Sequence, residues 1–317
     1  MRARLGRVLG TLAMFSSVAW CASDGLAVTP RSTLAPLDGS GHVAEDFAQA
    51  TTNMLEFVAL RYPPEQVRAY LGQWSPRFPG LCLFPTWDRW PLDPEGVLAE
   101  AVTMVAAEPT LGAPLLASAQ GAGVVMCLDE RHTGTFGYFE PRHGVIVVNR
   151  ELDSTSLAVI LVHELRHVEQ HERGLSPTLE VDMTAYARAH LATEADAQAV
   201  MTLFAWRLRL LGLEEAWEAM LEFDRYADIT TSFESVMEAG LSEVEATLAA
   251  FRAWAASEWR STTYYQGACL TYLDLLDELH AFRCYGALSE GFLDGMCTLP
   301  DGEAYDCEPS DAWRNAP

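Results

Sequence analysis

The sequence predicts a predominantly α-helical α+β fold, with a small antiparallel sheet beside the helix that carries the chemistry. Most of the chain places apolar residues at helical spacing. Three short runs rich in β-branched or aromatic residues are separated by turn residues, as strands are: Gly123–Leu128, Thr135–Phe139 and Gly144–Asn149. The last two runs are expected to form a hairpin, and the final run ends just before the functional helix.

The elements follow in order from hydrophobic periodicity and end signals. Residues 28–42 are rich in Pro, Ser, Thr and Gly, which predicts a flexible linker. The functional helix begins after Asp153 or Ser154, either of which can cap it, and it ends near Gly174. The other expected helices are 43–61, 65–74, 94–108 and 178–211, with further helices through 213–288.

The composition indicates a folded and acidic protein. With 317 residues, 50% of them hydrophobic, the chain can bury the core of one large domain or of two modest ones. The formal net charge is -23, and all 21 basic residues are arginine. Because an acidic surface repels phosphate backbones, we expect no binding to nucleic acid.

Residues 1–27 have the features of a signal peptide. Three arginines precede the apolar run Val8–Trp20, which is too short to span a bilayer comfortably, and small residues around Ala27 suit cleavage. One alternative is a lipoprotein signal with a lipid anchor at Cys21; another is a short anchor or buried helix. We expect a secreted, periplasmic or cell-envelope protein without a transmembrane span in the mature chain.

The other cysteines also favour export, because they form an even set suited to disulfide bonds: Cys82, Cys127, Cys269, Cys284, Cys297 and Cys307. If residues 262–286 form one helix, Cys269 and Cys284 lie about 22 Å apart along its axis and cannot bridge each other. We therefore expect these two to pair with the last two cysteines, and the first two of the set to pair with each other.

The stretch His163-Glu164-Leu165-Arg166-His167 carries the candidate chemistry. Its i, i+4 spacing puts both imidazoles on one helix face, about 6 Å apart along the axis, where they can hold one divalent metal. The Glu164 side chain points about 100° around the helix, which suits a general base acting on water. His171 stands about 12 Å from His163 along the axis, so it cannot join both histidines on one metal. The alternative interpretation is two histidines on a solvated helix face.

A carboxylate on the next long helix is a candidate third ligand. Glu194 shares its helix face with small and apolar residues, so its charge needs a partner, and a metal ion would be one. Asp196, Asp182 and Glu180 are alternatives. The last two open their helix, where carboxylates are also favoured by the helix dipole.

Together, the strand Gly144–Asn149, the motif helix and the segment Glu194-Ala195-Asp196-Ala197 resemble the zincin metallopeptidases, in particular the gluzincin-like branch whose third ligand is a glutamate. The resemblance covers residues 144–206. It implies a zincin-like core with one Zn²⁺ held by His163, His167 and Glu194. It also implies that Glu164 is the general base and that the strand before the helix is the edge along which an extended peptide lies.

Other residues are candidates for orienting a ligand or for stabilising the transition state. Some members of the branch have an acidic residue one turn after the third ligand, and Gln198 stands there in this chain. The group that steadies His163 therefore stays open. The candidate donors are His190, Gln198 and Tyr186, with Tyr264 and Tyr265 as further candidates for the oxyanion donor.

The predicted organisation is a signal peptide over 1–27, the linker over 28–42, a zincin-like metallopeptidase core with an N-terminal helical part over 43–212, and a helical, disulfide-stapled region over 213–317. The predicted function is an exported zinc-dependent metallopeptidase that hydrolyses peptide or protein substrates with a metal-activated water. The alternatives are a catalytically inactive, metal-binding scaffold of the same fold, and an envelope interaction protein in which the motif is incidental. The residues do not identify a substrate.

Overall fold

The computed structural model describes residues 81–83, 96–129, 136–142, 144–289 and 291–307. The expected signal peptide, the linker and the first two expected helices lie outside these residues. The described part is mostly helical with one small sheet, so the predicted α+β class is confirmed. None of the described helices is both long enough and apolar enough to cross a membrane.

The sheet has four strands in the order β1-β2-β4-β3, and it is mixed rather than wholly antiparallel as expected. The strands are β1 (Leu81–Leu83), β2 (Val125–Asp129), β3 (Gly137–Glu140) and β4 (Val145–Asn149). The expected hairpin of β3 and β4 is present. The chain reverses between β2 and β3 and again between β3 and β4, and β4 then inserts between the other two. As a consequence, β2 and β4 run parallel.

This strand order changes which strand forms the edge beside the functional helix. The strand before that helix is β4, and it lies inside the sheet with Val145 to Val148 buried. The expectation that β4 is the edge strand is therefore wrong. An edge strand has one side unpaired, whereas β4 pairs with β2 on one side and with β3 on the other. The edge strand is β3.

The described helices are α3 (Val97–Ala107), α4 (Gly112–Gly121), α5 (Ser154–Glu172), α6 (Met183–Leu210), α7 (Glu215–Glu222), α8 (Ala227–Glu238), α9 (Glu243–Ala256), α10 (Glu258–Glu278) and α11 (Phe292–Met296). Helix α4 was not expected from the sequence. It begins where the buried carboxylate of Glu108 accepts hydrogen bonds from the amides of Leu111 and Gly112, so a side chain outside the helix caps it.

Helix α5 forms as expected and for the expected reasons. The Asp153 carboxylate caps it by accepting from the Ser156 amide at 2.8 Å. Leu157 to Val162 are buried, whereas His163 is half-buried. The helix stops before Gly174, whose φ of 72° is a left-handed conformation that favours glycine. A buried stem therefore holds the first histidine where the core meets a cavity.

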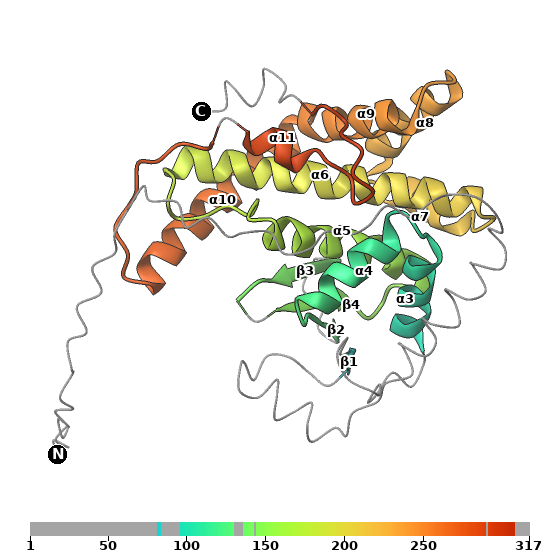
Figure 1. The fold of residues 1–317 in the computed structure, drawn as a ribbon, viewed down its shortest axis with the longest axis horizontal. Coiled ribbons are helices and arrows are strands. Elements are labelled where there is room, and N and C mark those ends of the chain that lie inside the picture. The colour runs from blue at the N-terminus through green and yellow to red at the C-terminus, as the bar shows by residue number, and fades with distance from the viewer. Residues whose placement is uncertain (1–80, 84–95, 130–135, 143, 290, 308–317) are drawn as a thin grey trace, which may run out of the picture.

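Helix α6 is the longest of the described helices, with 28 residues. It begins at Met183, later than expected, because the Asp182 carboxylate caps it by accepting from the Ala185 amide at 2.8 Å. Figure 1 shows α6 crossing the molecule, with α5 and the sheet on one side and α8 and α9 on the other. One hydrophobic core includes side chains of α3 to α9, α11 and the end of the described chain, so α5 and α6 are fixed from both sides.

The C-terminal part corrects two expectations. Helix α10 ends at Glu278, and His280 adopts a φ of 49°, so the continuous helix through residue 286 is wrong. Cys297 and Cys307 bond to each other, because the chain turns back between them through a bridge of Thr298 with Ala304.

The expected pairing of the last four cysteines is therefore wrong. Cys269 is a free thiol, which agrees with the expectation that it does not bridge Cys284. Cys127 and Cys284 are disulfide-bonded, with partners outside the described side chains. The backbone of Cys82 lies opposite Cys127 in the register of β1 and β2. The predicted bond between these two stays a prediction.

Candidate metal centre

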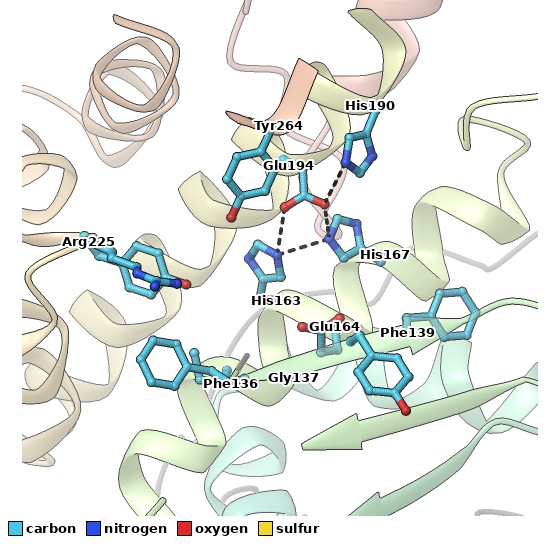
Figure 2. A pocket seen from close by; sticks show the side chains of 13 residues that line it. Phe136, Gly137, Phe139, His163, Glu164, His167, His190, Glu194, Arg225 and Tyr264 are labelled. Atoms are coloured by element: carbon cyan, nitrogen blue, oxygen red, sulfur yellow. Dashed lines mark hydrogen bonds and ion pairs between the residues drawn. The ribbon is translucent and has the colours of Figure 1, made fainter. Parts of the chain in front are cut away.

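Helices α5 and α6 bring three potential ligands together, as Figure 2 shows. The Nε2 atoms of His163 and His167 lie 3.1 Å apart. A Glu194 oxygen lies 3.6 Å from Nε2 of His163, and the other lies 3.4 Å from Nε2 of His167. One ligand atom from each residue lies within 4.8 Å of the others, which makes the set a candidate metal site.

The three distances fit a tetrahedral divalent ion. Zinc bonds to histidine nitrogen and carboxylate oxygen at about 2.0 to 2.2 Å, so two ligand atoms in a tetrahedral site lie about 3.3 to 3.6 Å apart. The separations of 3.4 and 3.6 Å, each to a different Glu194 oxygen, lie in that range, and the 3.1 Å between the two nitrogens lies just below it. Two neutral nitrogens and one carboxylate are also a ligand set that zinc accepts.

The two helices face each other with complementary charge. Burial by itself would raise the pKa of Glu194, but the charge of His167 and hydrogen bonds from both ligand histidines hold that pKa well below its usual range. Burial by itself would lower the pKa of His167, but the Glu194 carboxylate raises it to about 9. The carboxylate is therefore ionised, and without a metal His167 supplies the positive charge that balances it.

Glu164 lies beside the three candidate ligands, only 5% exposed. Burial is the main cause that raises the pKa of this carboxyl group, and the neighbouring Glu194 raises it further. The two ligand histidines and a hydrogen bond from the Phe139 amide oppose the shift. The Phe139 amide belongs to β3, so the edge strand and α5 together position this carboxylate.

A cavity of about 340 Å³ opens next to these groups. Its walls come from β3, α5, α6, α10 and the segment between α7 and α8. The lining residues combine the metal-ligand set with aromatic side chains and one arginine: Phe136, Gly137, Tyr138, Phe139, Ile160, His163, Glu164, His167, His190, Glu194, Arg225, Tyr226 and Tyr264.

Three polar side chains of this lining can donate hydrogen bonds toward a bound substrate. Nε2 of His190 lies 3.9 Å from Glu194, and burial lowers the pKa of this histidine. Burial also raises the pKa of Tyr264 to about 12 and raises that of Tyr226. Both tyrosines therefore keep their hydroxyl protons at neutral pH.

Several other sequence candidates lie away from the cavity lining. Asp182 caps α6, and Glu180 is exposed. His171 is also exposed, with its ring 6.0 Å from that of Phe139. Tyr186 packs against Tyr272 in a separate small cluster.

The remaining candidates are Gln198, Asp196 and Tyr265, and none of them lines the cavity. Gln198 is buried, and its Nε2 has no hydrogen-bond partner among the described residues. Asp196 is buried in an ion pair with Arg166. Nδ1 of His163 is likewise without a hydrogen-bond partner in the described part of the chain, so no described side chain steadies this ligand through Nδ1.

Sequence reasoning missed Arg225, Tyr226, the β3 residues and Gln170. Oε1 of Gln170 lies 2.8 Å from Nδ1 of His167. Its position three residues after His167, on the same helix face, was a signal that could have identified it. Tertiary packing brings β3 and the segment between α7 and α8 to the cavity. The sequence has no local pattern that predicts this packing.

The model of one protein family, whose description reads "Putative metallopeptidase family (DUF6782)", matches residues 80–307. The match runs from β1 to the disulfide near the end of the described chain, and it includes all residues of the candidate metal centre. No curated protein matches the chain. No solved structure matches it either.

Proposed function

Because the chain belongs to this putative metallopeptidase family, we propose that it is an exported zinc-dependent peptidase that hydrolyses peptide bonds. The observation that carries the proposal is the convergence of His163, His167 and Glu194, with Glu164 beside them in one cavity. A ligand set of two histidines and one carboxylate favours zinc, and it leaves a coordination position for water or substrate.

When bound, zinc would supply a Lewis acid that polarises a carbonyl group and lowers the pKa of water to about 7. Glu164 takes the proton from the attacking water and later returns it to the leaving amine. Its burial suits this double role, because burial raises the pKa of the carboxyl group and makes it a better proton acceptor than an exposed glutamate. Tyr264, Tyr226 and His190 are the donors proposed for the oxyanion, since all three line the cavity.

The substrate in this proposal is a peptide bound in an extended conformation. The edge strand β3 lines the cavity with four successive residues, 136 to 139, the last three of them in the strand. An extended peptide can add to such an edge by backbone hydrogen bonds. The aromatic rings of Phe136 and Phe139 would then contact apolar side chains of the substrate.

The proposed location of the protein is outside the cytoplasm, because residues 1–27 have the features of a signal peptide.

The test is hydrolysis of a mixed peptide library by the wild type and by Glu164→Gln. We expect the variant to lose about 10²- to 10⁴-fold in kcat, because amide replaces carboxylate and cannot take the proton. Zinc content is expected to be unchanged, since Glu164 is not in the ligand set. Equal activity of the two proteins would contradict the proposed role of Glu164. A wild type that binds zinc but cleaves no peptide would indicate a metal-binding scaffold instead.

A further inference from the structure

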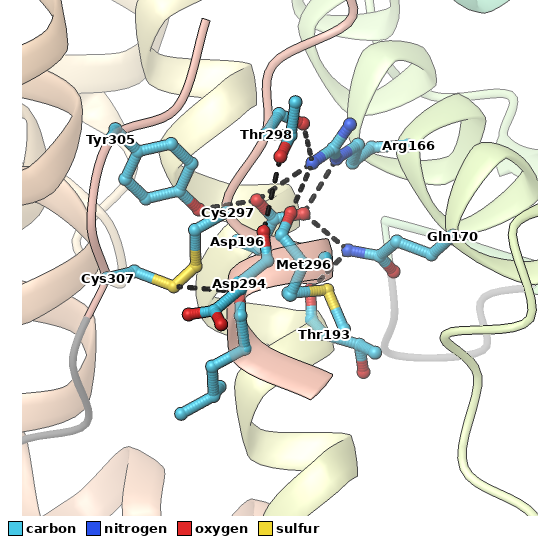
Figure 3. The surroundings of a disulfide bond; sticks show 12 residues. Arg166, Gln170, Thr193, Asp196, Asp294, Met296, Cys297, Thr298, Tyr305 and Cys307 are labelled. Carbon is cyan, nitrogen blue, oxygen red and sulfur yellow. Dashed lines mark hydrogen bonds and ion pairs between the residues drawn. A yellow bond between two sulfur atoms is a disulfide. The ribbon is translucent and has the colours of Figure 1, made fainter. Parts of the chain in front are cut away.

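A buried polar network connects α5, α6 and the C-terminal disulfide (Figure 3), and none of its side chains lines the cavity. Its centre is the ion pair of Arg166 and Asp196, both fully buried. Nε of Arg166 donates to one Asp196 oxygen at 2.6 Å, and a second guanidinium nitrogen donates to the other oxygen at 3.0 Å. Arg166 stands inside the motif, directly before the ligand His167.

Gln170 connects this ion pair to the metal centre. Its Nε2 donates to the Thr193 carbonyl at 3.0 Å and to Asp196 at 2.6 Å. The Thr193 carbonyl and the Asp196 carboxylate can only accept hydrogen bonds, so the atom of the Gln170 amide that faces them must be the nitrogen. Oε1 of Gln170 therefore faces Nδ1 of His167, 2.8 Å away, and Nδ1 must be the donor. This hydrogen bond directs Nε2 of His167 to the site where the ligand atoms converge.

The loop from Cys297 to Cys307, closed by their disulfide, supplies the outer part of the network. A guanidinium nitrogen of Arg166 donates to the carbonyls of Met296, the residue before the loop, at 2.9 Å and of Thr298 at 2.8 Å. The Tyr305 hydroxyl donates to Asp196. The loop itself is held by the disulfide and by a hydrogen bond from the Tyr305 amide to the Cys297 carbonyl at 3.0 Å.

We propose that this disulfide-closed loop is a positioning element for the metal centre, with Tyr305, Asp196 and Gln170 as positioning residues that act on His167. The proposal rests on the proposed metal-binding function. A buried ion pair is a poor source of stability, because apolar side chains of similar size often stabilise a fold as well or better. The same groups are well suited to orient a ligand, since each one fixes the hydrogen-bonding direction of the next.

Two tyrosines allow a matched test, because each is fully buried and loses one hydroxyl hydrogen bond on replacement by phenylalanine. Tyr305 donates to Asp196, whereas Tyr272 donates to the Val181 carbonyl at 3.2 Å, in a cluster apart from the network. The measurement is zinc affinity of the metal-free full-length chain by competition with a chromogenic chelator, together with thermal unfolding of the metal-free protein.

We expect Tyr305→Phe and Gln170→Leu to weaken zinc binding about tenfold or more. Tyr272→Phe should bind zinc like the wild type even if its thermal stability falls. The double variant Cys297→Ala/Cys307→Ala should also bind zinc more weakly, because the loop that holds Tyr305 is opened. In Co²⁺-loaded protein, the visible absorption band of Tyr305→Phe should shift, as the ligand geometry relaxes.

Wild-type zinc affinity in Tyr305→Phe and Gln170→Leu, with thermal stability lowered, would overturn the proposal and leave the network a purely structural role. If zinc binds the wild type normally, that result leaves the proposed function standing. A wild type that does not bind zinc would overturn both, because no metal ligand would be left to position.

Discussion

Arg225 places a fixed positive charge in the cavity of a protein whose net charge is -23. Its guanidinium lies 5.9 Å from the ring centroid of Trp259, a cation–π contact. Its backbone carbonyl accepts a hydrogen bond from Arg260 at 2.8 Å. An arginine held in this way is suited to bind a carboxylate of the substrate, either at a peptide C-terminus or on an acidic side chain.

Replacing Arg225 by alanine should therefore raise KM for substrates with a carboxylate near the scissile bond. A hydrogen bond to a charged group contributes about 1.5 to 3 kcal/mol, which corresponds to a rise in KM of about 10- to 160-fold. Comparing peptides with free and amidated C-termini tests binding of the terminal carboxylate. Comparing peptides with glutamate and glutamine tests binding of an acidic side chain. Arg252→Ala removes the same charge from an exposed position outside the cavity lining and should have little effect. Equal losses on charged and neutral peptides would contradict this role.

For single residues, the sequence predicted the candidate site best where the positions of the side chains depend only on their spacing along one helix. The i, i+4 histidines and the intervening Glu164 follow from helix geometry alone. Glu194 follows less directly, because only the packing of α6 on α5 brings its oxygens within 3.6 Å of both histidines. Asp196 is an alternative ligand by sequence, but its partner in the structure is Arg166, through a tertiary contact that hydrophobic periodicity does not predict.

At the scale of elements, β3 approaches α5 closely because residue 137 is glycine. A Cβ atom there would lie 3.0 Å from Cγ2 of Ile160, 3.1 Å from Oε1 of Glu164 and 3.2 Å from the Val147 carbonyl oxygen. These separations are shorter than ordinary van der Waals contacts between such atoms. The spacing between edge strand and helix therefore depends on the missing side chain.

Gly137→Ala should lower kcat while leaving zinc affinity close to that of the wild type. The added methyl group displaces the Glu164 carboxylate, and a small misplacement of a catalytic group can reduce the rate about 100-fold. Gly267→Ala, in the middle of α10 with no atom within 4 Å of the added Cβ, is the matched control. That control should keep full activity and gain up to about 1 kcal/mol in stability. Unchanged kcat in Gly137→Ala would show that Glu164 tolerates the contact.

Elements were predicted well where their ends are marked by residues one or two positions from the element. Helix α5 was predicted because Asp153 and Gly174 mark its ends and an apolar run fills it. Helix α4 was missed because its cap is Glu108, a side chain beyond the helix. The hairpin of β3 and β4 follows from sequence proximity, whereas the parallel pairing of β2 with β4 is long-range and has no local signal.

At the scale of the whole molecule, the candidate metal centre joins parts of the chain that are far apart in sequence. One hydrophobic core extends from α3 to the Cys297–Cys307 disulfide, and α6 runs through its middle. The sequence predicted a disulfide-stapled C-terminal region, but the predicted pairing of its cysteines was wrong, because parity and spacing alone do not determine which cysteines pair. The loop lies against Arg166 only in the folded protein.

Zinc should stabilise this whole assembly, since the site requires α5 and α6 to be packed together and is absent from the unfolded chain. At a free zinc concentration 100 times Kd, the expected gain in the free energy of unfolding is about 2.7 kcal/mol. Thermal unfolding of metal-free protein with increasing zinc measures it. Glu194→Ala should show a much smaller increase in Tm, because one of the three ligands is removed. An increase as large as that of the wild type would place the zinc elsewhere.

The most direct test of a metal-dependent peptidase is the metal content of the purified protein, measured by elemental analysis after dialysis against zinc-containing buffer and then metal-free buffer. The predicted result is about one equivalent of zinc per chain, lost in His163→Ala, His167→Ala and Glu194→Ala but kept in Glu164→Gln. A wild-type content below about a tenth of an equivalent, measured on folded protein, would contradict the proposed metal centre.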